Sequence, residues 1–191
     1  MKKGMISAPQ PEAVDAGADI LNLGGNAIDA AIACAFVQGV VDPLMCGIGG
    51  FGSMQLFMPK LKVHECIDFH GKAPEKAAPD MWADRIEGET RDGFGFILKD
   101  RVNDLGYQSI TAPGSLKAYY EAHCDYGVLD WKTILQPAID YAKNGWVVRP
   151  HVDFWWSIKN HFGRTPNPDR VKFSKSGMEL YCDAKGNLKS V

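Results

Sequence analysis

The sequence predicts a layered α/β protein, and three features indicate this class. Residues 9–23 and 26–37 have the spacing and end signals of two successive helices. Residues 46–70 that follow contain a glycine-rich turn and two segments typical of paired strands. The chain has 191 residues, 46% of them hydrophobic and 23% charged, which is enough for a core. We therefore expect residues 1–191 to form a single domain.

The two predicted helices differ in how they should pack. The first, over residues 9–23, begins with prolines suited to a first turn and is followed by glycines that can supply a left-handed cap. In the second, Asn26 is the expected N-cap and Asp29 occupies the reciprocal position of a capping box. Residues 27–37 are nearly all small or apolar, so we expect this helix to be buried on most sides and to pack on a sheet.

A glycine-rich segment comes next, with the sequence Cys46-Gly-Ile-Gly-Gly-Phe-Gly. It leads into one strand, and after Pro59 a second strand covers residues 63–70, so the two strands should pair as a hairpin. The glycines also suggest a nucleotide-binding loop, but that motif needs a preceding strand and a following helix. Here a strand follows. The other interpretation is that these glycines allow the backbone to bend or to pack closely.

The remaining chain combines irregular and helical segments. Residues 83–106 mix charge with glycine and show no sustained period, which predicts a loop. A helix is predicted from Thr111, as its N-cap, to Gly127. Another covers residues 131–143, in which Pro137 predicts a kink or a locally loosened turn.

The last segments are less regular. The aromatic run Phe154-Trp155-Trp156 implies a face that is buried or covered by a partner. Residues 164–191 are polar and rich in turn formers, and they give only a weak indication of any element. In an isolated chain we expect exposed apolar surface on the hairpin and on residues 154–156, and hence self-association.

Charge and hydropathy exclude several classes of function. The net charge of −2 and the scattered basic residues argue against nucleic acid as a partner. No segment reaches the roughly 18 apolar residues of a membrane span, and none resembles the apolar part of a signal peptide. We therefore expect a cytoplasmic protein, or a secreted or periplasmic one if a leader was removed.

The five cysteines are widely spaced and form no C-x-x-C pair of the metal-binding or redox kind. We interpret them as reduced thiols, mostly buried, and expect neither a metal site nor a cofactor. A cysteine that acts as a nucleophile with a distant histidine is the alternative.

The residues alone contain no complete catalytic set, since G-x-S-x-G and H-E-x-x-H are both absent. Four blocks, in order and at compatible spacing, nevertheless resemble the N-terminal part of the large subunit of the gamma-glutamyltransferase (gamma-glutamyltranspeptidase) family. The blocks are Leu21-Asn-Leu-Gly-Gly-Asn-Ala-Ile-Asp-Ala-Ala, Cys46-Gly-Ile-Gly-Gly-Phe-Gly, Ile67-Asp-Phe-His-Gly-Lys-Ala-Pro, and Thr111-Ala-Pro-Gly-Ser running on to Leu135-Gln-Pro-Ala-Ile-Asp-Tyr-Ala-Lys-Asn-Gly-Trp.

This resemblance implies the αββα sandwich of an N-terminal-nucleophile hydrolase, only part of which is present in this chain. It also implies a precursor that cleaves itself, so that a new N-terminal Thr of the small subunit acts as nucleophile with its own amine as base. Nothing in the chain aligns with that cleavage site. Thr111 and Thr133 are internal, so we expect no catalytic residue in this chain and the missing small subunit as its partner.

The resemblance carries one substrate-binding position onto this chain. In the family pattern Asp-Phe-Arg-x-x-Ala-Pro, the arginine grips the α-carboxylate of the γ-glutamyl group, and His70 stands at that place here. Arginine offers a permanently charged fork, whereas histidine, with a usual pKa of about 6.5, is mostly neutral at pH 7. Lys72 is a second candidate that could supply the missing charge. A strand-end histidine without a ligand is the other interpretation of His70.

Three functions remain open at this stage. The first is a gamma-glutamyltransferase-like amide hydrolase or acyltransferase acting on a small-molecule amide or γ-glutamyl substrate. The second is a related amidase or acylase of the cephalosporin-acylase or oxamate-amidohydrolase type. The third is a noncatalytic fragment or binding protein built on the same half fold. In each case we expect this chain alone to be inactive.

Overall fold

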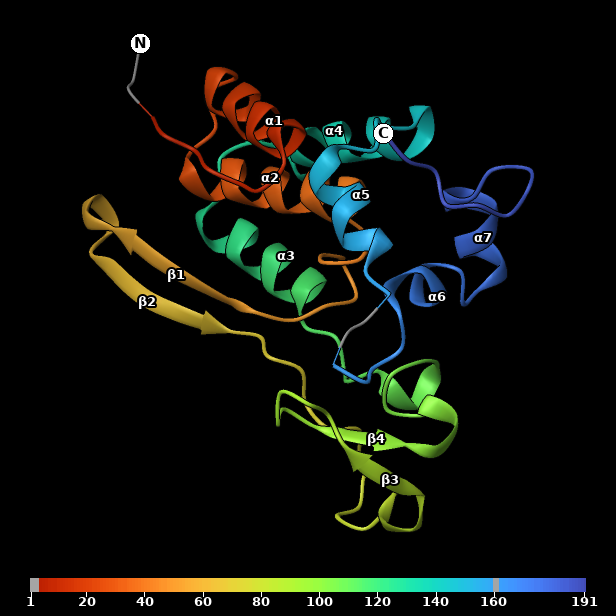
Figure 1. The fold of residues 1–191 in the computed structure, drawn as a ribbon. Coiled ribbons are helices and arrows are strands. Elements are labelled where there is room, and N and C mark those ends of the chain that lie inside the picture. Colours follow the sequence, from red (N-terminus) through yellow and green to blue (C-terminus); the bar gives the residue numbers. More distant parts are fainter. Residues whose placement is uncertain (1–3, 160–161) are drawn as a thin grey trace. The chain divides into compact units, whose positions relative to one another are not determined.

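The helices and strands of the computed structural model, which describes residues 4–159 and 162–191, fall into two compact units (Figure 1). Unit 1 comprises residues 1–72 and 113–147, and unit 2 comprises residues 73–112 and 148–191. Whether both belong to the single domain expected over residues 1–191 stays a prediction.

Unit 1 holds a hairpin and most of the helical residues. Its elements are α1 (Pro11–Asn22), α2 (Ala27–Val41), β1 (Ser53–Met58), the 3-10 turn η1 (Pro59–Leu61), β2 (Val63–Asp68), α3 (Ser115–Tyr126) and α4 (Trp131–Asn144). The predicted helices and the hairpin are confirmed, and α4 continues through Pro137. The predicted N-cap Thr111 is wrong, because the cap is Gly114, whose amide is engaged by a carbonyl of the glycine-rich segment.

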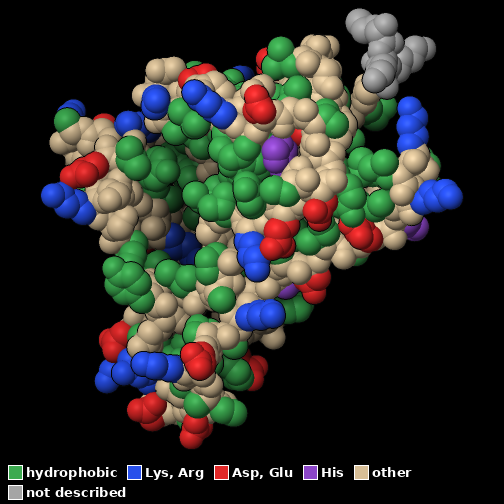
Figure 2. Space-filling model, turned by 180° about the vertical axis from the view of Figure 1, so that it is seen from behind, with side chains coloured by type: hydrophobic (Ala, Val, Ile, Leu, Met, Phe, Trp, Pro, Cys, Tyr) green, Lys and Arg blue, Asp and Glu red, His purple; other side chains and the backbone are tan. Residues whose placement is uncertain are grey.

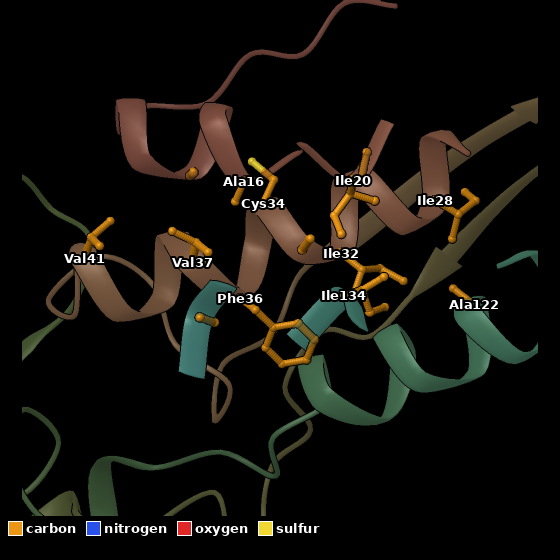
Figure 3. Close-up of a cluster of buried hydrophobic side chains, with 14 of the residues drawn as sticks. Ala16, Ile20, Ile28, Ile32, Cys34, Phe36, Val37, Val41, Ala122 and Ile134 are labelled. Carbon is orange, nitrogen blue, oxygen red and sulfur yellow. The ribbon is translucent and has the colours of Figure 1, made fainter. Parts of the chain in front are cut away.

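Helix α2 is buried on most sides, as its composition predicts. Its main neighbours are the helices α1, α3 and α4, rather than the sheet that we expected. In Figure 3, Ala16 and Cys34 lie between α1 and α2, whereas Phe36 points to the opposite side of α2. The Phe36 ring meets the rings of Tyr119 on α3 and Trp131 on α4 edge-on, with centroids 5.6 Å apart in both pairs.

The hairpin has an inner and an outer face. In register, Met54 pairs with Ile67 and Leu56 with Glu65, and Leu56 is buried in the same hydrophobic cluster as α2. The alternate positions of both strands, including Phe57 with 70% of its surface exposed, form the outer face. The hairpin thus adds one face to the core of unit 1 and leaves the other open.

The carboxylate of Asp29 ties the start of α2 to the connection between α3 and α4. It is fully buried and accepts hydrogen bonds from the Asn26 amide, at 2.9 Å, and from the Val128 amide, at 3.2 Å. Asn26 completes the predicted capping box by accepting from the amides of Ile28 and Asp29. A Cβ on Gly127 would lie 2.9 Å from the Asp29 Oδ1, so glycine is needed for this approach.

Unit 2 contains a second hairpin and three short helices. Its elements are η2 (Ala83–Arg85), β3 (Ile86–Glu89), β4 (Phe96–Leu98), η3 (Lys99–Arg101), η4 (Tyr107–Ser109), α5 (Pro150–Ser157), α6 (Asn167–Val171) and α7 (Lys175–Tyr181).

The loop predicted over residues 83–106 is therefore wrong, because β3 and β4 pair as an antiparallel hairpin there. A register shift between Ile86 and Gly88 interrupts the alternation that would have indicated a strand. The turn depends on Gly93 and Gly95, both with positive φ, and the Thr90 amide donates to the Gly95 carbonyl at 2.8 Å.

Ion pairs join this hairpin region to residues 164–191. Arg164 forms a bidentate contact with Asp92, at 2.7 and 3.0 Å, and this contact holds the pKa of the Asp92 carboxyl far below its usual value. Asp104 accepts from the Thr165 amide and from the Arg170 guanidinium. Residues 164–191 are therefore more ordered than their composition indicates, with two helices and a bridge between Cys182 and Leu188.

Two expectations about burial need correction. Of the aromatic run at residues 154–156, Phe154 is exposed, but Trp156 is only 1% exposed and packs on Tyr181, so only part of this run is open surface. The cysteines are all free thiols, but most of them are exposed: Cys34 and Cys182 are buried, whereas Cys46, Cys66 and Cys124 are not. Hydrophobic side chains also form patches on the face of the molecule that Figure 2 shows.

Replacing Asp29 tests its role in this packing. We expect Asp29→Ala to lower the free energy of unfolding by about 2–4 kcal/mol, because it removes a cap and leaves buried amides without an acceptor. Urea unfolding followed by circular dichroism measures this loss. The control Asp15→Ala removes an exposed carboxylate from α1 and should change stability by less than about 0.5 kcal/mol. Equal effects of the two substitutions would contradict the assignment.

Candidate functional site

The candidate site lies where strand β2 ends, and three segments of unit 1 meet there. Beyond β2, Phe69 continues the ladder: its amide donates to the Gly52 carbonyl at 3.0 Å and its carbonyl accepts from the Gly52 amide at 3.4 Å. The Gly50 carbonyl accepts from the amides of Gly114 and Ser115, at 3.0 and 3.2 Å. The glycine-rich segment thus holds both the end of β2 and the first turn of α3.

Gly114 sets how closely α3 approaches this strand end. A Cβ at this position would lie 2.6 Å from the Phe69 carbonyl oxygen, which is closer than any side chain tolerates without a backbone shift. The Phe69 ring also packs edge-on against Tyr119 of α3, with ring centroids 5.7 Å apart. These contacts fix the backbone immediately before His70. Within the glycine-rich segment, a Cβ on Gly52 would lie 3.2 Å from the Phe69 ring, whereas one on Gly47 or Gly49 would meet nothing within 4 Å, so close packing accounts for only some of these glycines.

His70 follows this fixed backbone and projects an open imidazole. Its side chain is 62% exposed, and both its amide and its Nδ1 contact the same oxygen of Asp68, the amide at 3.0 Å and the Nδ1 at 2.9 Å. The Phe51 ring lies beside the imidazole, with centroids 5.6 Å apart. One nitrogen edge of His70 is therefore anchored to the protein while the ring remains accessible.

Asp68 is held as a carboxylate by this arrangement. The hydrogen bond from the His70 amide, followed by that from the His70 side chain, lowers the pKa of the Asp68 carboxyl below its usual value. The charge of Lys72 acts in the same direction as a smaller contribution. The structure therefore brings His70 together with Asp68, whereas the exposed Lys72 acts on the Asp68 carboxyl through its charge.

Asp68 and Phe51 escaped prediction from the sequence, and a local signal could have identified only one of them. An aspartate two residues before another residue often accepts from that residue's amide, so the Asp68-Phe-His70 spacing indicates the anchored geometry. Phe51 is separated from His70 by the whole hairpin, so its contact depends on the pairing of β1 with β2.

An apolar groove of about 640 Å³ lies beside the glycine-rich segment and along α3. Its lining consists of Ile48, Gly49, Pro113, Leu116, Lys117, Tyr120 and Trp131. Lys117 is the charged member of this lining, and it also pairs with Glu121 on the next turn of α3, at 3.6 Å. The groove offers apolar surface of the kind that small ligands occupy.

Three further observations concern metal, thiol and membrane chemistry in residues 4–159 and 162–191. Within them, no group of three or more His, Cys, Asp or Glu side chains is arranged to hold a metal ion. Burial raises the pKa of the Cys34 thiol, which disfavours the thiolate that a nucleophile needs. In the same part of the chain, no helix is both long and apolar enough to cross a bilayer.

Comparison with known proteins relates this chain to one protein family. The family model described as Gamma-glutamyltranspeptidase matches residues 13–187, which include both strands of the first hairpin and the candidate site. The chain belongs to the gamma-glutamyltranspeptidase family. The resemblance in the four sequence blocks is thereby confirmed.

The chain is similar to curated relatives of two kinds. The chain is 40% identical over 153 residues to the Acylase ACY 1 proenzyme of Pseudomonas sp. (strain V22), a match that covers 78% of this chain and 26% of the relative. It is 37% identical over 147 residues to the Glutathione hydrolase proenzyme of Bacillus subtilis (strain 168), covering 77% and 24%. The chain therefore spans about a quarter of the length of these curated relatives.

Solved structures show the same fold. Gamma-glutamyltranspeptidase from Helicobacter pylori superposes with a TM-score of 0.81 at 24% identity, covering 100% of this chain and 49% of that one. Cephalosporin acylase from Bacillus halodurans superposes with a TM-score of 0.66 at 32% identity, covering 86% and 27%. The predicted fold class is confirmed as a mixed α/β partial fold that matches part of these enzymes.

A glycine substitution tests the scaffold of the site. We expect Gly114→Ala to lower the free energy of unfolding by about 1–3 kcal/mol, because its methyl group collides with the Phe69 carbonyl. Gly47→Ala is the control, since a Cβ there meets nothing within 4 Å. Denaturant titration gives both values, and NMR shifts of His70 report any displacement of the strand end. Equal destabilisation by the two variants would refute the close-approach argument.

Proposed function

We propose that this chain is part of an amide hydrolase or acyltransferase that uses an N-terminal Thr nucleophile, and that this Thr lies in sequence outside the chain. The observation that carries the proposal is the match to the Gamma-glutamyltranspeptidase model over residues 13–187. About three quarters of the length of the curated relatives has no counterpart here, which leaves room for the nucleophile and for a partner subunit.

In this proposal the chain supplies contacts to the acyl group. His70 occupies the place at which the family pattern has its carboxylate-binding arginine, and its imidazole is exposed at the end of β2. Lys72 adds a positive charge two residues further on. The apolar groove along α3 offers surface for the uncharged part of a substrate.

A related acylase is the second candidate, and His70 favours it. A neutral imidazole forms one good hydrogen bond, whereas an arginine fork forms two charge-assisted bonds with a carboxylate. The similarity to the Acylase ACY 1 proenzyme and to a cephalosporin acylase supports an acyl group other than γ-glutamyl. A noncatalytic binding protein on the same half fold is the third candidate, and the next experiment separates it from both enzymes.

Mass spectrometry of the complete protein, combined with an amide hydrolysis assay, tests the proposal. We expect a second polypeptide whose first residue is Thr, together with hydrolysis that is lost when this Thr is replaced by Ala. The isolated 191-residue chain is the control and should be inactive. An unprocessed complete protein without amidase activity would favour the binding protein.

Replacing His70 by arginine tests the acyl-binding position. In the complete enzyme, we expect His70→Arg to raise kcat/KM for a γ-glutamyl anilide about fivefold to tenfold, because a permanent charge strengthens the bond to the α-carboxylate. His64→Arg is the matched control: it adds the same side chain to the exposed outer face of β2 and should leave kcat/KM unchanged. An equal response to both variants would remove His70 from the site.

A further inference from the structure

The anchored edge of His70 determines which nitrogen of the ring carries its proton. The Nδ1 lies 2.9 Å from the Asp68 Oδ1, and the His70 amide donates to the same oxygen. An ionised carboxylate only accepts hydrogen bonds, so the Nδ1 must be the donor in this contact. A neutral imidazole has a single N–H group, and with that group on Nδ1 the Nε2 presents a lone pair.

The free edge of His70 meets no competing protein group in the described parts of the chain. No hydrogen bond to its Nε2 occurs among residues 4–159 and 162–191. The charged groups near the ring on its own strand end are Asp68 and Lys72. From the glycine-rich segment the uncharged Phe51 lies beside it, and the β1 residue opposite Asp68 is the uncharged Ser53.

Two charged residues of α3 are engaged with each other. On the helix that packs on Phe69, Lys117 and Glu121 pair with each other. The Nε2 of His70 is thus left for a ligand, and its hydrogen-bonding character follows from Asp68.

We propose that Asp68 is a positioning residue that holds His70 in the Nδ1–H tautomer, so that the neutral ring favours acyl groups carrying a hydrogen-bond donor over those carrying only a carboxylate. This inference rests on the proposed function, because it takes His70 to contact the acyl group. With the proton on Nδ1, Nε2 accepts from an ammonium, amide or hydroxyl group. When both nitrogens are protonated, Nε2 donates to a carboxylate instead.

Two matched substrates test the proposal in the complete enzyme. The 4-aminobutyryl and glutaryl p-nitroanilides have acyl chains of the same length that end in an ammonium and a carboxylate, respectively. Neither terminal group changes its charge between about pH 5.5 and about pH 8. Effects of pH on the nucleophile act on both substrates, so they cancel in the ratio of the two kcat/KM values.

We expect the ratio of aminobutyryl to glutaryl kcat/KM to be at least about threefold lower at pH 5.5 than at pH 8, because a proton on Nε2 turns a hydrogen-bond acceptor into a donor. Asp68→Asn should lower the ratio at pH 8 at least about threefold, because an amide can donate to Nδ1 and so admits the other tautomer. Asp125→Asn is the control: it neutralises an exposed carboxylate on α3 and should leave the ratio unchanged. His70→Gln should make the ratio independent of pH.

Nitrogen NMR of the enzyme labelled with ¹⁵N-histidine gives a readout that does not depend on activity. At pH 8 the His70 signals, identified by their loss in His70→Gln, should show a protonated Nδ1 and an unprotonated Nε2. In Asp68→Asn they should show a mixture of tautomers.

The possible failures are distinguishable. Two results overturn this inference and leave the proposed function intact. One is amide hydrolysis in which the ratio of the two kcat/KM values does not change with pH. The other is an Nε2–H tautomer of His70 in the wild type. A complete protein that hydrolyses no amide at any pH overturns both.

Discussion

The buried carboxylate of Asp29 is the interaction on which the organisation of unit 1 depends. A charge taken fully out of water is tolerated only when hydrogen-bond donors surround it. Asp29 obtains them from the Asn26 amide at the start of α2 and from the Val128 amide after α3. His123 adds a nearby imidazole, with Nε2 at 3.8 Å from the carboxylate. One side chain therefore sets both where α2 begins and where the chain turns from α3 towards α4.

The candidate site depends on this arrangement through α3. Because α3 packs on α2, its first turn is carried to the glycine-rich segment, where the Gly50 carbonyl accepts the amides of Gly114 and Ser115. The same segment pairs with Phe69 and so holds the backbone that leads to His70. The exposed imidazole is thus built on a backbone that is fixed from two sides, which is the condition for orienting a ligand.

In the proposed function, His70 takes the place of an arginine, and the two side chains offer different chemistry to a ligand. An arginine is always charged and offers donors only, so its partner must be an acceptor. A histidine can present either a donor or an acceptor, and its second nitrogen decides which. In our proposal Asp68 sets this choice, because its Oδ1 contacts both the His70 amide and the His70 Nδ1.

The sequence by itself determined the features that local chemistry controls. The capping box of Asn26 and Asp29, the buried character of α2 and the first hairpin all follow from short-range patterns, and His70 stands out within one block of residues. Only the tertiary structure decided what these elements meet. Helices, rather than the expected sheet, are the main neighbours of α2. The strands β3 and β4 pair as a hairpin although a register shift interrupts their alternation. The ring of Phe51 lies beside His70, from which the whole first hairpin separates it in sequence. Such contacts depend on the pairing and packing of distant segments, which leave no period or spacing in the sequence around each residue.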